Sequence, residues 1–218
     1  MSAGMRREEL VRMFAAAAQQ IRREHERLSQ LDSICGDGDH GTTMVNAVEA
    51  METAMNATSA TNVSVLLKGA GWGVLGVDGG ASSAILGTFF AGMGVTDLGE
   101  ECDCGQFARS LAAGLRAVQK QSKATAGDKT MMDALVPAVE TFAAAAADGS
   151  DVREAMKQAA DAAQAGADAT KDMVARYGRA KFLGDKTRGC EDAGAVSIAL
   201  LFRGFSVALS EEKEDSHA

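Results

Sequence analysis

The sequence predicts an all-α protein, and three observations support this prediction. Alanine is abundant, a single proline occurs in 218 residues, and β-branched residues rarely alternate with polar ones. Alanine favours helices and proline breaks them, whereas alternation is the pattern of a strand. With 46% hydrophobic content, the chain is long enough for a well-buried core. We therefore expect one all-α domain over residues 1–218.

Apolar residues at helical spacing, separated by short connections, indicate about eight helices. The first is expected from about Arg6 to Ser29, with one apolar face. Thr130–Asp133 and Ser150–Asp151 have the pattern of helix starts. The further helices are expected at residues 42–56, 61–75, 81–94, 104–120, 131–147, 152–176 and 193–209. Short connections imply antiparallel neighbours, and hence a bundle or barrel of helices.

Composition argues against several classes of partner. The 22 Lys and Arg against 30 Asp and Glu give a net charge of -8, with no basic patch for nucleic acid or an anionic membrane. The N-terminus lacks the apolar core of a signal peptide, and no apolar run approaches the roughly 20 residues that span a bilayer. The four cysteines lack the paired spacing of a zinc site. We expect a cytoplasmic protein whose charged tail, Glu211–Ala218, is frayed.

Glycine is concentrated in loops that directly precede predicted helices. These loops are Gly36–Gly41, Gly69–Gly80, Gly127–Asp128 and Gly178–Gly194. A purely structural bundle does not need glycine at so many helix entrances, whereas a protein whose backbone amides approach a phosphate does. The pattern therefore indicates phosphate binding at the entrances of several helices.

The loop after the first helix carries Asp32, Asp37 and Asp39 within eight residues. Three such carboxylates repel one another unless they are solvated or share a cation, and hard divalent cations suit an all-oxygen site. The loop fails the EF-hand spacing, which would need glycine at Thr42 and glutamate at Val48. Magnesium is the better candidate. A solvated acidic turn that caps a helix remains the alternative.

The helix entrances after this loop resemble phosphate sites but match no common nucleotide motif. His40–Thr43 opens a helix whose free amides and two threonine hydroxyls can receive phosphate oxygens. Val77–Ser83 has the same character but lacks the Gly-Lys-Ser/Thr ending of a P-loop. Two Gly-x-Gly-x-x-Gly matches, at Gly36 and Gly71, lack the strand–turn–helix context of a dinucleotide site.

Basic residues in the later loops divide into one candidate ligand and several surface charges. The guanidinium of Arg179 can bond two phosphate oxygens at once, so we expect it to anchor a phosphate. Exposed salt bridges are the simpler interpretation of the other cations, Lys129, Lys181, Lys186 and Arg188.

Together these segments resemble the DhaL family, the L subunits or C-terminal domains of dihydroxyacetone kinases. The resemblance covers nearly the whole chain in the family's order. It is carried by Gly-Asp-Gly-Asp-His-Gly (36–41), Gly-Gly-Ala-Ser (79–82), Gly-Asp-Lys-Thr-Met (127–131), Gly-Arg-Ala-Lys-Phe-Leu-Gly (178–184) and Asp-Ala-Gly-Ala (192–195). It implies a barrel of eight antiparallel helices with ATP or ADP at one end.

The resemblance also implies the residues of that site. Asp32, Asp37 and Asp39 would hold two Mg²⁺ ions that bridge the phosphates. The nucleotide would be bound by His40, Gly41, Thr42, Thr43, Ala81, Ser82, Ser122, Met131, Arg179, Asp192, Ala193 and Gly194. Two departures bear on this assignment: the family often has proline at Ala193, and often glycine at Ser122. Residues 185–190 also depart from the family's usual sequence, so we assign them no role.

In this family the sugar is held covalently by a histidine of a separate K subunit. The chain agrees with that division, since its histidines, His25, His40 and His217, are not placed to hold a ketose. The resemblance thus implies an Mg-ATP-dependent kinase subunit for dihydroxyacetone or a related ketose. With threonine at positions 42 and 43, the sequence resembles the ATP-dependent branch of the family.

Two alternatives remain open, and a third lacks a feature that it requires. In the phosphotransferase-system branch, a bound ADP does not exchange and is recharged by a phosphohistidine protein. A non-catalytic regulatory subunit is a second alternative, although all three carboxylates are kept. A magnesium-dependent enzyme acting on diphosphates would need a second acidic cluster, which Asp185, Glu191 and Asp192 are too dispersed to supply.

Overall fold

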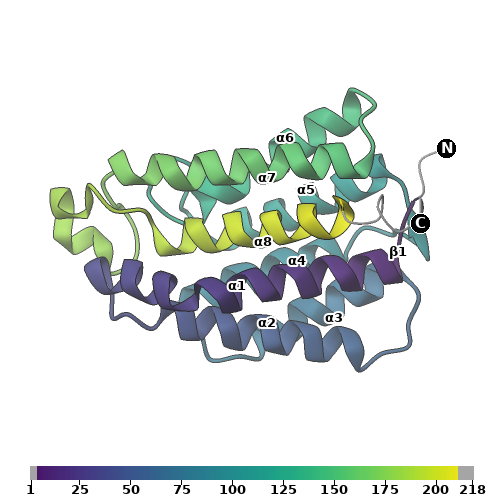
Figure 1. Ribbon diagram of the computed structural model, residues 1–218, viewed down its shortest axis with the longest axis horizontal. Helices are drawn as coiled ribbons and strands as arrows, with labels where there is room; N and C mark the ends of the chain where they lie inside the picture. Colours follow the sequence, from purple (N-terminus) through teal and green to yellow (C-terminus); the bar gives the residue numbers. More distant parts are fainter. Residues whose placement is uncertain (1–3, 211–218) are drawn as a thin grey trace.

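The computed structural model describes residues 4–210 and is predominantly helical (Figure 1). In chain order its α-helices are α1 (Arg7–Cys35), α2 (His40–Asn56), α3 (Val63–Leu75), α4 (Gly80–Met93), α5 (Cys104–Gln121), α6 (Met132–Ala147), α7 (Val152–Ala169) and α8 (Ala193–Ser210). The 3₁₀ segments η1 (Thr170–Asp172) and η2 (Ala180–Thr187) precede α8. The predominantly helical prediction is confirmed. The tail expected to fray, residues 211–218, lies outside the described residues.

Two predicted helix ends are wrong. The first helix continues past Ser29 to Cys35, because no glycine or proline interrupts it before Gly36. Asp32 therefore lies on the last turn of α1 rather than in a loop. The helix expected over residues 152–176 ends at Ala169, and the chain continues as η1, where the Thr170 hydroxyl donates to Ala167 O at 2.5 Å.

A two-stranded ribbon was not predicted, because each strand has only two residues. Strand β1 (Met5–Arg6) pairs antiparallel with β2 (Glu101–Cys102). The ribbon ties the start of α1 to the connection between α4 and α5. Directly after the ribbon, the Asp103 carboxylate accepts from Gln106 N at 2.7 Å and caps α5. Asp103, which lies between Cys102 and Cys104, therefore has a structural role.

Each α-helix packs against the next along the chain, and α8 packs against both α7 and α1. The helix axes run along the long direction of the molecule, with β1 at one end and η2 at the other (Figure 1). Because neighbours are antiparallel, α2, α4, α6 and α8 all begin at the η2 end. This arrangement brings four helix amino termini to one end of the molecule.

Helix α8 forms the centre of the packing. Its 18 residues are apolar enough, by length and composition alone, to cross a membrane, but 78% of them are buried inside the protein. The ring of Phe205 in α8 lies 5.2 Å from that of Phe14 in α1, at an interplanar angle of 35°. The Phe14 ring also lies 4.9 Å from that of Phe90 in α4. The sequence was expected to hold no such apolar run. Its burial identifies α8 as a core helix.

Lys129 fixes the loops at the η2 end. Its side chain is 3% exposed, and its ammonium donates to Thr170 O at 2.6 Å and to Cys190 O at 2.5 Å. The prediction that Lys129 forms an exposed salt bridge is therefore wrong. Its backbone has a positive φ of 59°, and the neighbouring amides of Gly127 and Thr130 donate to the carboxylate of Asp133. The loop before α6 is thus held to the segments that flank η2.

The contact between α1 and α8 depends on Gly204. A Cβ atom at this position would overlap main-chain atoms of Ala17. We predict that Gly204→Ala lowers the free energy of unfolding by about 1–3 kcal/mol, because the two helices must separate. Chemical denaturation measures this change. Gly69→Ala is the matched control: that helix position has free space around it, so the substitution should stabilise the protein by up to ~1 kcal/mol. Equal effects of the two substitutions would contradict the assigned packing.

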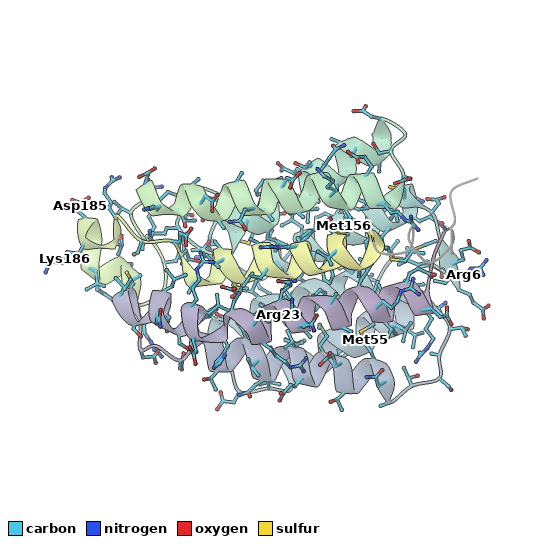
Figure 2. The ribbon with its side chains drawn as sticks, viewed as in Figure 1. Arg6, Arg23, Met55, Met156, Asp185 and Lys186 are labelled. Atoms are coloured by element: carbon cyan, nitrogen blue, oxygen red, sulfur yellow. The ribbon has the colours of Figure 1, made fainter. Side chains whose placement is uncertain are left out.

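Removing the Lys129 ammonium should loosen the loops that it joins. We predict that Lys129→Met lowers the free energy of unfolding by about 2–4 kcal/mol, because two enclosed carbonyl groups lose a charged donor. The control is Lys186→Met, at an exposed position at the tip of the molecule (Figure 2). The control should leave stability unchanged. If Lys129→Met were equally neutral, the ammonium would not hold these loops.

Candidate functional site

The three acidic residues converge at the end of α1. Asp32 is on its last turn, Asp37 lies in the following loop and Asp39 directly precedes α2. One carboxylate oxygen of each lies within 4.8 Å of the other two. Gly38 allows this turn with a φ of 80°, and its amide donates to Asp32 Oδ2 at 2.8 Å. The loop therefore presents a compact all-oxygen set, which is the ligand chemistry that Mg²⁺ prefers.

Without a bound cation, the repulsion between the three carboxylates makes this cluster electrostatically unfavourable. The carboxyl terminus of a helix carries a partial negative charge, and the last turn of α1 has no basic residue to offset it. Arg179, at the start of η2, forms an ion pair with Asp37, but both side chains are substantially exposed. An exposed pair contributes little stability, so most of the repulsion between the three carboxylates remains. The charge and geometry of the cluster fit a divalent ion.

His40 links the first turns of α2, α4 and α8. Its Nε2 lies 2.7 Å from Ser197 Oγ, and its Nδ1 lies 3.3 Å from Ser82 Oγ. Because the Ser197 hydroxyl donates to Ala193 O at 3.0 Å, we assign the ring proton to Nε2, and Nδ1 accepts from Ser82. Burial lowers the pKa of His40, so the ring is neutral at pH 7. The first turns of α2, α4 and α8 are thereby held at fixed positions.

Beside His40, the predicted phosphate-binding residues surround the starts of α2 and α4. Thr42 and Ala81 are exposed, whereas Thr43 and Ser82 are partly buried. Gly41 is buried and lies so close to α1 that a Cβ atom there would overlap the carbonyl oxygen of His25. The structure therefore brings these residues to one place, with the free amides of two helix starts beside them.

A second group of predicted residues lies around the start of α8. Met131 packs against Gly194, where a Cβ atom would lie 2.5 Å from Met131 Cγ. Asp192 accepts from Ala195 N at 2.8 Å and so caps α8. The turn therefore forms with Ala193 in place of the family's usual proline. Removal of the Asp192 carboxyl from water raises its pKa to about 6.

The hydroxyl of the predicted residue Ser122, like that of Ser82, is already engaged within the chain. It accepts from Ala124 N at 3.1 Å, while the backbone amide of Ser122 ends α5 by donating to Val118 O at 2.8 Å. The next residue, Lys123, accepts from the Tyr177 hydroxyl at 3.0 Å through its carbonyl. This bond brings the end of α5 close to the segment that carries Arg179. A role for the Ser122 side chain in binding a base stays a prediction.

Sequence reasoning missed Ser197 and the burial of Lys129. Ser197 is fully buried, and its partner His40 is 157 residues away along the chain. A single polar residue in the apolar stretch after Asp192 was the available signal. Lys129 was grouped with exposed cations because its acceptors, the carbonyls of residues 170 and 190, cannot be identified from local sequence. Ser197 fixes His40 at the start of α2, and Lys129 joins the loops on either side of η2.

Comparison with known proteins agrees with this geometry. The ADP-binding subunit DhaL of PEP-dependent dihydroxyacetone kinase 1 from Listeria innocua is 33% identical over 184 residues, covering 84% of this chain and 87% of that subunit. The corresponding subunit of Escherichia coli is 32% identical over 189 residues, covering 86% of this chain and 90% of its own length. These relatives are therefore similar along most of their length.

A solved structure shares the fold. The dihydroxyacetone kinase of C. freundii, determined with AMP-PNP and Mg²⁺, superimposes with a TM-score of 0.71 at 24% identity. The match covers 95% of this chain and 35% of that kinase, so the chain spans about a third of it. The family model described as the DAK2 domain matches residues 34–207, which contain the acidic loop after Cys35 and the start of α8. The chain belongs to the DAK2 domain family.

Proposed function

We propose that this chain is the nucleotide-binding, phosphoryl-transferring subunit of a two-component kinase for dihydroxyacetone or a related small ketose. The observation that carries the proposal is the convergence of Asp32, Asp37 and Asp39 within 4.8 Å beside the amino termini of α2 and α4. Carboxylates attract the cation of a magnesium nucleotide, and helix amides attract its phosphates. The DhaL relatives, which are named ADP-binding, support this assignment.

In this proposal the acidic loop would hold two Mg²⁺ ions, which neutralise phosphate charge when bound. His40 donates no proton to the nucleotide, since its Nε2–H is engaged by Ser197, and instead fixes the amides around it. Thr42 and Thr43 offer hydroxyl donors, and Arg179 would bond phosphate oxygens once it leaves Asp37. Gly41, Ala81 and Ser82 would line the same phosphate side. The other predicted residues would complete the nucleotide pocket: Ser122, Met131, Asp192, Ala193 and Gly194. The protein's task is mainly positioning.

The proposal assigns the ketose to a separate sugar-binding K subunit in the cytoplasm. The described part of the chain supports this division: His25 is exposed on α1 and His40 is enclosed by two serines, so neither is placed to bind a sugar covalently. We further propose that the helices, each packed on the next and α8 on α1, form the eight-helix barrel implied by the resemblance. The open phosphate end would face the partner subunit.

The donor distinguishes two versions of the proposal. We favour Mg-ATP, because Thr42 and Thr43 resemble the ATP-dependent branch. The alternative is ADP that stays bound and is recharged by a phosphohistidine protein, and the PEP-dependent relatives support that version.

Release and exchange of bound nucleotide distinguish the two donors. Protein purified with Mg²⁺ should exchange its bound nucleotide for labelled ATP within the time of one turnover. Bound ADP that is retained and does not exchange would contradict ATP as the donor.

The acidic loop can be tested by a single substitution. We predict that Asp37→Asn weakens Mg²⁺-dependent nucleotide binding about tenfold or more, because the loss of one ligand charge worth ~1.4 kcal/mol already has that effect. Titration calorimetry with ADP and Mg²⁺ measures it. Without Mg²⁺, the variant should unfold at the same temperature or higher, since its carboxylates repel less.

The matched control is Asp97→Asn, which makes the same charge change in the exposed connection between α4 and β2. It should bind nucleotide as the unmodified protein does. Equal losses in both variants would attribute the effect to net charge rather than to a metal site. Unchanged binding by Asp37→Asn would remove that residue from the proposed ligand set.

A further inference from the structure

Two cysteines that are distant in the sequence meet beside the acidic loop. Cys35 ends α1, and Cys190 lies between η2 and α8, 155 residues further along the chain. Their Sγ atoms are 3.8 Å apart, which is van der Waals contact, and both residues are partly exposed. Both thiols are free. Neither residue has a role in the function proposed above.

We propose that Cys35 and Cys190 form a reversible disulfide, and that this bond weakens the binding of magnesium nucleotide. The first statement depends on the geometry of the two sulfur atoms alone. The second rests on the proposed function. The pair would therefore be a modification site through which an oxidising small molecule lowers the activity of the subunit.

The chemistry requires an oxidant, and a low-molecular-weight disulfide such as oxidised glutathione is sufficient. One cysteine sulfur attacks the glutathione disulfide, forms a mixed disulfide and releases one glutathione thiol. The second cysteine then attacks the bound protein sulfur and releases the other. Two protein thiols are oxidised, one disulfide is reduced, and the two protons end on glutathione. An excess of reduced thiol reverses the reaction.

The Cys190 side of the pair is firmly anchored. The Lys129 ammonium holds Cys190 O at 2.5 Å, and Gly189 N donates to Lys171 O at 2.8 Å. Lys129 is itself buried and also bound to Thr170 O. Since a disulfide brings the sulfur atoms from 3.8 Å to about 2 Å, one side must move. The contacts around Cys190 oppose its movement.

The hydrogen bonds on the Cys35 side are local, and the exposed ion pair of Asp37 with Arg179 is a weak link to the η2 segment. Gly36 N donates to Asp32 O at 2.5 Å and Gly38 N to Asp32 Oδ2 at 2.8 Å, so these contacts stay within the last turn of α1 and its loop. Asp37 follows Cys35 by two residues. Movement of Cys35 toward Cys190 therefore displaces the loop that carries the carboxylates. The three oxygens would then no longer converge as they do in the reduced protein.

Tryptic peptides allow the bond to be identified directly. Cleavage after lysine and arginine places Cys35 in residues 28–68, Cys190 in residues 189–203, and both Cys102 and Cys104 in residues 69–109. Reduced full-length protein is incubated with oxidised glutathione at mildly alkaline pH, because the thiolate is the form of cysteine that attacks a disulfide. Mass spectrometry without reductant should find 28–68 joined to 189–203, and reduction should separate them.

Variants give the controls. Cys104→Ser should form the joined peptide as the unmodified protein does, whereas Cys190→Ser should not form it. Glutathione left singly on either cysteine, or no joined peptide, would overturn the proposed disulfide. This readout is independent of any kinase activity, so it decides the first statement even if the protein binds no nucleotide.

Binding of ADP with Mg²⁺ tests the second statement. The oxidised protein should bind at least fivefold more weakly than the reduced protein, and dithiothreitol should restore affinity. Oxidant-treated Cys190→Ser should keep the affinity of the untreated variant. Equal affinity of the joined and reduced forms would overturn the regulatory effect. Absence of binding in the reduced protein would instead contradict the proposed function.

Discussion

The site depends on one electrostatic constraint: three carboxylates meet at the negative end of a helix. Asp32, Asp37 and Asp39 lie within 4.8 Å of one another where α1 ends, and Arg179 provides an exposed countercharge. Like charges at this distance disfavour one another, and the helix end adds to the repulsion. The sequence maintains the cluster with glycines that allow the turn. Such an arrangement is stable when it shares a cation, so the constraint itself indicates a metal-dependent role.

The amino termini of four helices add a positive potential to this site, beside the negative carboxylates. Helices α2, α4, α6 and α8 begin at this end, and contacts join their first turns: His40 to Ser82 and Ser197, and Met131 to Gly194. Their free amides give a positive potential that suits phosphates. A magnesium nucleotide has both a cationic and an anionic part. The fold presents a complementary surface to each, and buried Lys129 holds the loops between them.

The local features of this molecule were predictable from its sequence, and the long-range ones were not. Helical spacing located the helices closely, because each depends on nearby residues, and the acidic cluster was predictable because its members lie within eight residues. The extension of α1 through Asp32 was missed, since the carboxylates suggested a loop. The burial of Lys129, the pairing of His40 with Ser197 and the contact of Cys35 with Cys190 involve partners 41 to 157 residues apart, which no local pattern encodes.

The central claim is that the acidic loop binds the cation of a magnesium nucleotide. The most direct measurement is an anomalous difference map from crystals grown with AMP-PNP and Mn²⁺ in place of Mg²⁺. We expect manganese peaks in direct contact with carboxylate oxygens of Asp32, Asp37 and Asp39, with the phosphates at the starts of α2 and α4. Bound nucleotide with no manganese at this loop, or manganese bound elsewhere, would contradict it.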